Sequence, residues 1–155
     1  MTAKDARPCS VAAALSLIGE KWSLLVIREI SYGVFRFGEI ARNTGAPRDI
    51  LTTRLRRLEQ AGIVRRRQYH EHPPRFEYHL TRPGQELRPV LLSLQQWGDR
   101  WAIDTPPLVF QHACGNDLQL AHICRGCGNP VTGADLTVRY TRPGWSAHGP
   151  LEDPA

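Results

Sequence analysis

The chain has 155 residues, of which 41% are hydrophobic and 23% charged, and its formal net charge is +5. This composition suits one domain with a small appendage and excludes a globally disordered chain or a large multidomain enzyme. No apolar run approaches the ~18 residues that cross a membrane, and residues 1–8 lack the apolar segment of a signal peptide. Four cysteines are too few for a disulfide scaffold. We therefore expect a cytoplasmic protein without a membrane partner, whose cysteines serve thiol or metal chemistry.

The positive charge is concentrated in one part of the chain. Residues 48–82 contain nine arginines and four acidic residues, so this segment carries an excess equal to the whole net charge of +5. A solvated basic face is one interpretation of such a run. An excess that is purely arginine on one compact unit favours a polyanionic partner instead.

The spacing of apolar residues predicts four helices in the first 61 residues. The first follows the capping residue Ser10 and ends at Gly19. The others cover residues 21–31, 36–43 and 48–61, and residues 44–47 form a tight turn between the last two.

The pattern then changes to strands. Residues 63–69 and 75–80 predict a β-hairpin, joined by residues 70–74, whose two prolines prevent continued pairing. Thr81 is expected to cap a long helix over residues 82–103 that bends at Pro89.

A small β unit is predicted for the tail. Residues 104–107 form a break, residues 104–145 form a β tail that contains cysteine and histidine, and residues 146–155 are expected to fray, like the flexible residues 1–8. In this tail the apolar side chains are expected to face one another across a hairpin, with Leu118, Leu120 and Ile123 opposite Leu136 and Val138.

A helix, a glycine-containing turn, a helix and a β-hairpin follow in the order of a winged helix-turn-helix. The fold class is therefore mainly α with a β-hairpin wing, residues 9–103 forming a DNA-binding and dimerisation domain. At ~100° per residue, Leu51, Leu55 and Leu58 fall on the buried side of the helix over residues 48–61. An ordinary amphipathic surface helix has the same pattern, and the arginine-rich hairpin beside it favours the DNA-binding interpretation.

Two sets of DNA contacts follow from this geometry. Residues on the outer side of the helix are expected to read base edges, and arginines at its flanks and on the wing are expected to hold phosphates. The base-contacting set is Asp49, Thr52, Thr53 and Arg56. The phosphate-contacting set is Arg48, Arg54, Arg57, Arg65, Arg66, Arg67 and Arg75.

Several motifs in this order resemble the HxlR-type transcriptional regulators over residues 9–103. They are residues 9–11, 17–22 (LIGEKW), 36–40 (RFGEI), 51–59 (LTTRLRRLE), 62–64 (GIV) and 73–81 (PPRFEYHLT), followed by Gly84 and residues 87–91. The resemblance implies a homodimeric winged-helix repressor of neighbouring genes, with the first and last helices at the dimer interface. The chain departs from the family at Pro47, where a hydroxyl residue usually opens the recognition helix; proline suits a first turn, so the helix itself is expected to persist.

The dimer interface is expected on the apolar stripes of the first and last helices. Its residues are Val11, Leu15, Leu87, Leu91, Leu94, Trp97 and Trp101. Tryptophans there could instead line a pocket for a small-molecule effector, although such residues are more often core.

Cys9 matches an N-terminal cysteine that some HxlR-type members use to sense oxidants. A helix start with Lys4 and Arg7 nearby would favour its thiolate form. A small apolar residue at a helix start is the alternative interpretation.

His112, Cys114, Cys124 and Cys127 are candidate zinc ligands, with His122 as a competitor. Four soft ligands would close a tetrahedral structural site and would stabilise a tail with little core. Free thiols or a Cys124–Cys127 redox pair are the alternatives. The sequence thus predicts a transcriptional regulator that binds double-stranded operator DNA and responds to a small molecule or to thiol oxidation. A zinc- or CxxC-dependent thiol redox protein is the alternative, and no enzyme motif is present.

Overall fold

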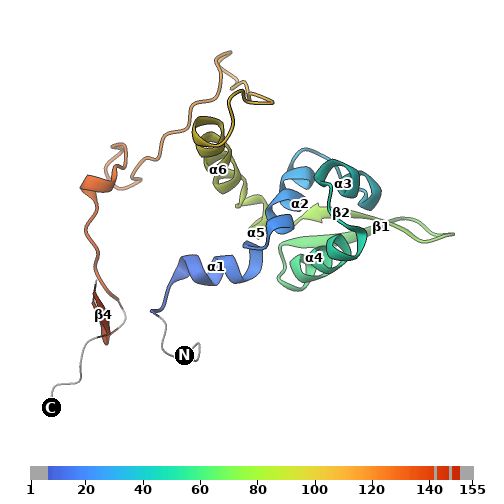
Figure 1. The fold of residues 1–155 in the computed structure, drawn as a ribbon, viewed down its shortest axis with the longest axis horizontal. Helices are drawn as coiled ribbons and strands as arrows, with labels where there is room; N and C mark the ends of the chain where they lie inside the picture. The colour runs from blue at the N-terminus through green and yellow to red at the C-terminus, as the bar shows by residue number, and fades with distance from the viewer. Residues whose placement is uncertain (1–6, 142, 147, 151–155) are drawn as a thin grey trace. The chain divides into compact units, whose positions relative to one another are not determined.

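The computed structural model describes residues 7–141, 143–146 and 148–150 (Figure 1). The chain divides into two compact units, one formed by Ser10–Pro107 and the other by Met1–Cys9 with Leu108–Ala155. Among the described residues no single helix is long and apolar enough to cross a membrane. The two helices Ser10–Ile18 and Lys21–Ser31, bent by 77° where they meet, pass that test only as a pair, by length and composition. Lys4 lies outside the described residues, as do most of the expected flexible N-terminus and most of the expected frayed end.

The first unit is a winged helix-turn-helix, which confirms the predicted fold. Its helices and strands follow one another as α1 (Ser10–Ile18), α2 (Lys21–Ser31), α3 (Phe37–Thr44), α4 (Arg48–Gln60), β1 (Val64–His70), β2 (Arg75–Leu80), α5 (Arg82–Gln85) and α6 (Arg88–Trp101). The strands β1 and β2 pair antiparallel, with Val64 opposite Leu80 at the base of the hairpin. α2 packs against α3, α4 and α6.

The core lies between α2, α3 and α4. Ile27 and Ile40 are fully buried against Leu51, Leu55 and Leu58 of α4. The helical period places these three leucines on one side of α4, as predicted. Burying each such side chain contributes roughly 1.5–3 kcal/mol. This packing holds the opposite side of α4 outward on a rigid element.

The turn between α3 and α4 depends on a left-handed glycine. Gly45 has φ of 70° and its N–H donates to the carbonyl oxygen of Ala41 at 3.0 Å, which ends α3. Pro47 then precedes α4 as its cap residue, with no side-chain capping bond. The helix forms without a side-chain cap, and its first intrahelical bond runs from the Leu51 N–H to the Pro47 carbonyl at 2.8 Å.

The prediction of one long helix over residues 82–103 is wrong in one respect, because the structure has two helices in this segment. α5 ends at Gln85 and α6 begins at Arg88, so Pro89 lies in the first turn of α6 instead of bending a longer helix. Proline is tolerated there because a first-turn N–H has no partner within its helix. Thr81 does act as a cap, but of α5, where its hydroxyl accepts the Gly84 N–H at 3.4 Å.

Gly84 lies where α5 crosses the end of the α4–β1 connection. A Cβ atom at this position would lie 2.2 Å from the carbonyl oxygen of Ile63. The same carbonyl accepts the Thr81 N–H at 3.0 Å, so the two segments are tied together at this point. Glycine is therefore required here by close backbone approach.

The second unit has little regular structure and no core among its described residues. It contains the short η1 helix (Gly133–Asp135) and the antiparallel pair β3 (Trp145–Ser146) and β4 (Gly149–Pro150). This pair confirms a small C-terminal β element, and residues 146 and 149–150 of it belong to the segment that was expected to fray. The predicted apolar hairpin is not formed, because Leu136 and Val138 are exposed and lie outside any strand.

Candidate nucleic-acid interface

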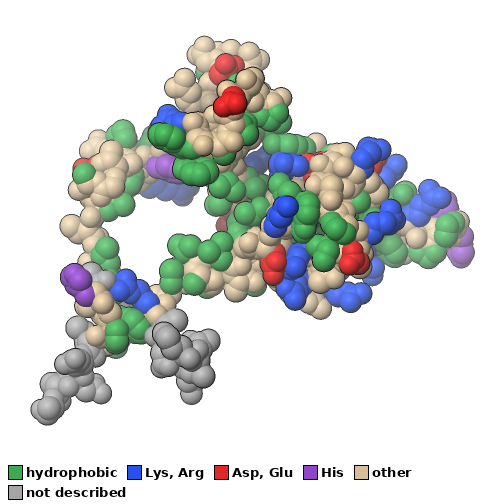
Figure 2. Space-filling view, viewed as in Figure 1, with side chains coloured by type: hydrophobic (Ala, Val, Ile, Leu, Met, Phe, Trp, Pro, Cys, Tyr) green, Lys and Arg blue, Asp and Glu red, His purple; other side chains and the backbone are tan. Residues whose placement is uncertain are grey.

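The outer side of α4 exposes the residues predicted to read bases. Asp49, Thr52, Thr53 and Arg56 are all exposed, opposite the buried leucines. Among the described residues Arg56 has no hydrogen-bond or ion-pair partner, so its guanidinium is available to a ligand. Figure 2 shows lysine and arginine side chains gathered over this unit and along its wing.

The two threonines on this face are already bonded to the helix. Thr52 Oγ1 donates to the Arg48 carbonyl at 2.7 Å, and Thr53 Oγ1 donates to the Asp49 carbonyl at 3.0 Å. Their hydroxyl protons are therefore used within α4. What each threonine offers a base is its methyl group and a hydroxyl oxygen that can accept a hydrogen bond.

The arginines at the flanks of α4 differ in their freedom. The Arg48 guanidinium lies over the Phe37 ring, 5.1 Å from its centroid, which orients the exposed start of the helix. Arg57 is also exposed, and its Nη1 lies 3.9 Å from Glu20 Oε1. Both residues remain exposed at the flanks of α4.

Arg54 departs from the prediction of a phosphate contact. Its side chain is only 13% exposed, and its Nη2 lies 3.2 Å from Glu20 Oε2 in the connection between α1 and α2. Its Nε and Nη1 atoms are buried and have no hydrogen-bond partner among the described residues. The Arg54 guanidinium thus faces its own protein, because Glu20 holds it there, and this position argues against a phosphate contact.

The wing distributes its arginines over two faces. Successive strand residues point to opposite sides, so Arg66 lies on the face of Tyr78 and Phe76, with its guanidinium 4.3 Å from the Phe76 ring centroid. Arg65 and Arg67 lie on the other face, opposite His79 and Glu77. The three arginines therefore extend from two faces of the wing. Burial raises the pKa of Tyr78, which keeps its phenol neutral where the hairpin packs on the core.

Arg65 lines a cavity of about 350 Å³ between α2, the wing and the α5–α6 segment. Its walls combine the polar side chains of Arg65, Arg88, His79 and Gln85 with apolar ones such as Phe35. Arg88 is fixed there because its Nη2 donates to the Ser31 carbonyl at 2.9 Å. Two guanidinium groups beside apolar walls suit a small organic anion.

Sequence reasoning missed two residues that position the interface. Arg36 lies over the Tyr69 ring at 4.9 Å, and its Nε lies 3.5 Å from Glu77 Oε1, which ties the start of α3 to the wing. Buried Glu29 accepts hydrogen bonds from Arg28 and from Asn43 Nδ2, the latter at 2.9 Å, which ties α2 to α3. Both ties join distant segments, and only the unusual Glu29 on the apolar side of α2 gave a sequence signal.

The predicted dimer residues separate into two groups. Leu87 and Leu91 are partly buried and pack on the core of their own chain. The others are exposed, with Trp97 at 60% and Trp101 at 70%; this group also contains Val11, Leu15 and Leu94.

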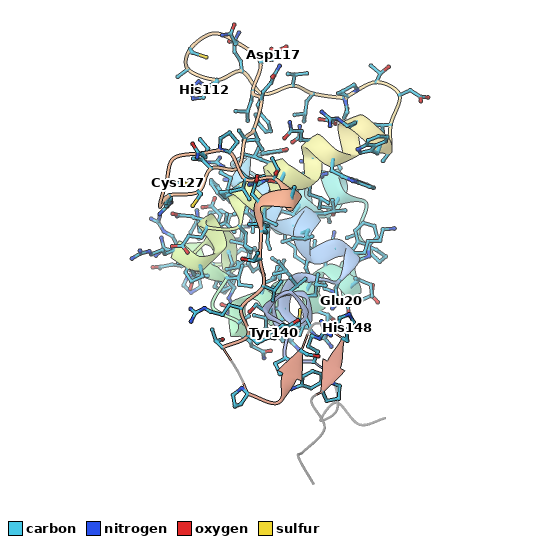
Figure 3. All side chains as sticks on the ribbon, turned by 90° about the vertical axis from the view of Figure 1, so that its left-hand side faces the viewer. Glu20, His112, Asp117, Cys127, Tyr140 and His148 are labelled. Carbon is cyan, nitrogen blue, oxygen red and sulfur yellow. The ribbon has the colours of Figure 1, made fainter. Side chains whose placement is uncertain are left out.

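The predicted zinc ligands lie in two loops of the second unit. His112 and Cys114 share the first loop, residues 111–117, and Cys124 and Cys127 share the second, residues 123–130; Figure 3 shows His112 and Cys127 on separate loops. Within the described residues no group of three or more possible ligands is assembled, so the four do not converge as predicted. The amides of Gly126 and Cys127 point at the Cys124 thiol and lower its pKa. All four cysteines, including Cys9 just before α1, are exposed and unpaired with one another.

Comparison with known proteins agrees with this architecture. An HTH-type transcriptional regulator of Mycobacterium tuberculosis is 42% identical over 131 residues, a match that covers 83% of each chain. The crystal structure of PA1607, described as a transcription factor, superimposes with a TM-score of 0.75 at 31% identity and covers 84% of this chain and 94% of that one. The redox regulator HypR in its oxidised form matches with a TM-score of 0.54 at 37% identity, over 59% of this chain and 96% of that one.

The family model for the HxlR-like helix-turn-helix matches residues 17–105, more than half of the chain. These relatives are transcriptional regulators, which supports the DNA-binding interpretation over a zinc- or CxxC-dependent thiol redox protein. The folded unit, the exposed face of α4 and the basic wing are what such a regulator requires. The chain therefore belongs to the HxlR-like helix-turn-helix family of transcriptional regulators.

Proposed function

We propose that the protein is a homodimeric repressor that binds a specific operator in cytoplasmic double-stranded DNA. The observation that carries this proposal is the outer side of α4, where Asp49, Thr52, Thr53 and Arg56 are exposed while the leucines behind them are fully buried. A rigid helix that presents arginine and threonine outward beside a basic hairpin suits insertion into a major groove.

The side chains have separate roles in this proposal. Arg56 donates two hydrogen bonds to a guanine edge, and the threonines contact neighbouring bases through methyl groups and hydroxyl oxygens. The surrounding arginines hold phosphates and set the register of the protein on the duplex. That phosphate set is Arg48, Arg57, Arg66, Arg67 and Arg75, with Arg54 removed because it faces Glu20 and Arg65 assigned to the cavity.

The second copy of the chain covers the apolar faces of α1 and α6. Two tryptophans that are at least 60% exposed on one helix are uncommon on a monomer surface, and family membership supports pairing of these helices. A two-fold axis there would set the two α4 helices about one DNA turn, ~34 Å, apart. A dimer seated on an operator that overlaps a promoter excludes polymerase, which is the repression we propose.

Footprinting of the DNA upstream of the protein's own gene tests this function. We expect protection of two half-sites about one helical turn apart, an affinity that falls steeply with salt, and a dimer mass by light scattering. Protection of two half-sites separates operator binding from a basic protein-interaction module, which would bind DNA without sequence specificity or not at all. A monomer at micromolar concentration, or protection without two half-sites, would contradict the proposed assembly.

We place the regulatory signal at Cys9, whose thiol is exposed. HypR, a relative of this protein, is described as a redox regulator. Hydrogen peroxide, which oxidises a thiolate to a sulfenic acid, should release the wild-type protein from its operator and leave Cys9→Ser bound. A gel-shift assay measures both. Equal release of the two proteins would remove Cys9 from the mechanism. Resistance of the wild type to peroxide would favour a small-molecule effector in the cavity lined by Arg65 and Arg88.

A further inference from the structure

The two loops of the second unit share a short sequence pattern. The first reads His112-Ala113-Cys114-Gly115-Asn116, and the second reads Cys124-Arg125-Gly126-Cys127-Gly128-Asn129. Each has a soft metal ligand, one or two intervening residues, a cysteine, and then glycine and asparagine. The two loops therefore share Cys-Gly-Asn and a preceding metal ligand, and they differ in the identity of that ligand and by one residue in its spacing from the cysteine.

The backbone hydrogen bonds repeat in the same way. In the first loop the His112 N–H donates to the Asn116 carbonyl at 2.9 Å, and the Gly115 N–H donates to the His112 carbonyl at 2.9 Å. In the second loop the Cys124 N–H donates to the Asn129 carbonyl at 2.9 Å, and the Gly128 N–H donates to the Cys124 carbonyl at 2.7 Å. An isolated β-bridge closes each loop, between residues 111 and 117 in one and between residues 123 and 130 in the other.

The backbone geometry turns each cysteine back toward the first ligand of its loop. The glycine after the cysteine has φ of 90° at Gly115 and 77° at Gly128, a left-handed conformation that glycine adopts readily. In both loops the amide of the cysteine then points at the side chain of the first ligand. The Cys114 N–H lies 3.3 Å from His112 Nδ1, and the Cys127 N–H points at Cys124 Sγ.

Two such loops supply the ligand set of a structural zinc site. We propose that His112, Cys114, Cys124 and Cys127 bind one Zn²⁺ per chain, as one imidazole and three thiolates. Zinc is tetrahedral and accepts this set, and a closed site of four protein ligands leaves no position for catalysis. On binding, each thiol loses its proton to solvent and the metal takes its place, with no change in oxidation state.

The loops must close on one another to complete this site, and their connection is short. The five residues 118–122 join them, a segment that spans at most about 17 Å when fully extended. The described part of residues 108–150 buries no side chain. It therefore has no hydrophobic core that would resist this closure or stabilise the unit in place of the metal. Metal binding would then contribute much of the folding free energy of this unit.

Zinc content of the full-length protein, purified without chelator, tests the site. We expect about one equivalent per chain, and a loss of most of it in Cys114→Ser, Cys124→Ser and Cys127→Ser. The matched control is Cys9→Ser, which removes a cysteine outside the two loops and should keep the metal. His112→Asn and His122→Asn form a second pair, of which only the first should lose zinc.

Cobalt(II) titration reports the ligands directly, because thiolate charge-transfer absorption scales with the number of bound cysteines. The wild type and Cys9→Ser should show equal absorption, and each loop cysteine variant should show weaker absorption. Circular dichroism and light scattering should show that the winged helix-turn-helix and its assembly survive chelation, since its core is complete in Ser10–Pro107. Less than about a tenth of an equivalent of zinc in the wild type, or full zinc in Cys114→Ser, would overturn the proposal.

Discussion

Replacing Gly84 with alanine is expected to lower the free energy of unfolding of the winged helix-turn-helix by about 3 kcal/mol. The added methyl carbon would lie 2.2 Å from the Ile63 carbonyl oxygen and 3.1 Å from Leu80 Cδ2. The first of these atoms belongs to the backbone, so relief requires α5 to move away from the α4–β1 connection. That movement would stretch the bond from the Thr81 N–H to the same carbonyl. Urea unfolding, followed by the circular dichroism of the helices, measures the change.

Gly38→Ala is the matched control for Gly84→Ala. Gly38 is also a glycine within a helix, but a Cβ atom there would meet nothing within 4 Å. This variant should be neutral or slightly more stable, since alanine has the higher helix propensity. If both variants unfold at the same urea concentration as the wild type, the close approach at Gly84 does not constrain the fold.

Arg56→Ala is expected to weaken binding to the operator by about 1–3 kcal/mol, which is roughly 5- to 150-fold in Kd. The affected contact is sequence-specific, so affinity for random DNA should change little. Discrimination at one base pair of each half-site should relax as well. Fluorescence anisotropy with operator and scrambled duplexes at one salt concentration measures the difference.

Arg66→Ala provides the comparison for Arg56→Ala. Its guanidinium lies on the wing over Phe76, away from the outer side of α4, and a phosphate contact there carries no sequence information. Binding to operator and to scrambled DNA should fall together, and the dependence of affinity on salt should become shallower. Equal losses on both duplexes for Arg56→Ala would show that the base-reading role is misassigned.

The buried side of α4 could be predicted from the sequence, and the partner of Arg54 could not. Leucine spacing determines which side of α4 packs on the core, and Leu51, Leu55 and Leu58 are buried as the period requires. Arg54 lies near the edge of that side, where helical angle alone leaves its orientation open. Glu20, 34 positions earlier in the chain, decides it by ion pairing.

The tail was harder to predict because its order does not come from apolar packing. Leu118, Leu120 and Ile123 are apolar residues that we predict to face Leu136 and Val138 across a hairpin, but no hairpin partner buries them. What the structure shows instead is a repeat of Cys-Gly-Asn in two loops, which was visible in the sequence as residues 114–116 and 127–129. Glycine after a cysteine was the signal, because left-handed glycine defines the loop more strongly than hydrophobicity does.

The irregularity in the hairpin register between Gln68 and His70 separates the wing into a stem and a tip. Below it, the pairing from Val64 with Leu80 to Gln68 with Phe76 determines which face each arginine occupies. Inserting or deleting one residue within the stem would exchange the faces of Arg65, Arg66 and Arg67. An insertion or deletion beyond the irregularity would leave their faces unchanged. The wing tip can therefore lengthen or shorten among relatives, which would alter how far the wing reaches along DNA. The faces that the arginines occupy at the base of the wing would stay the same.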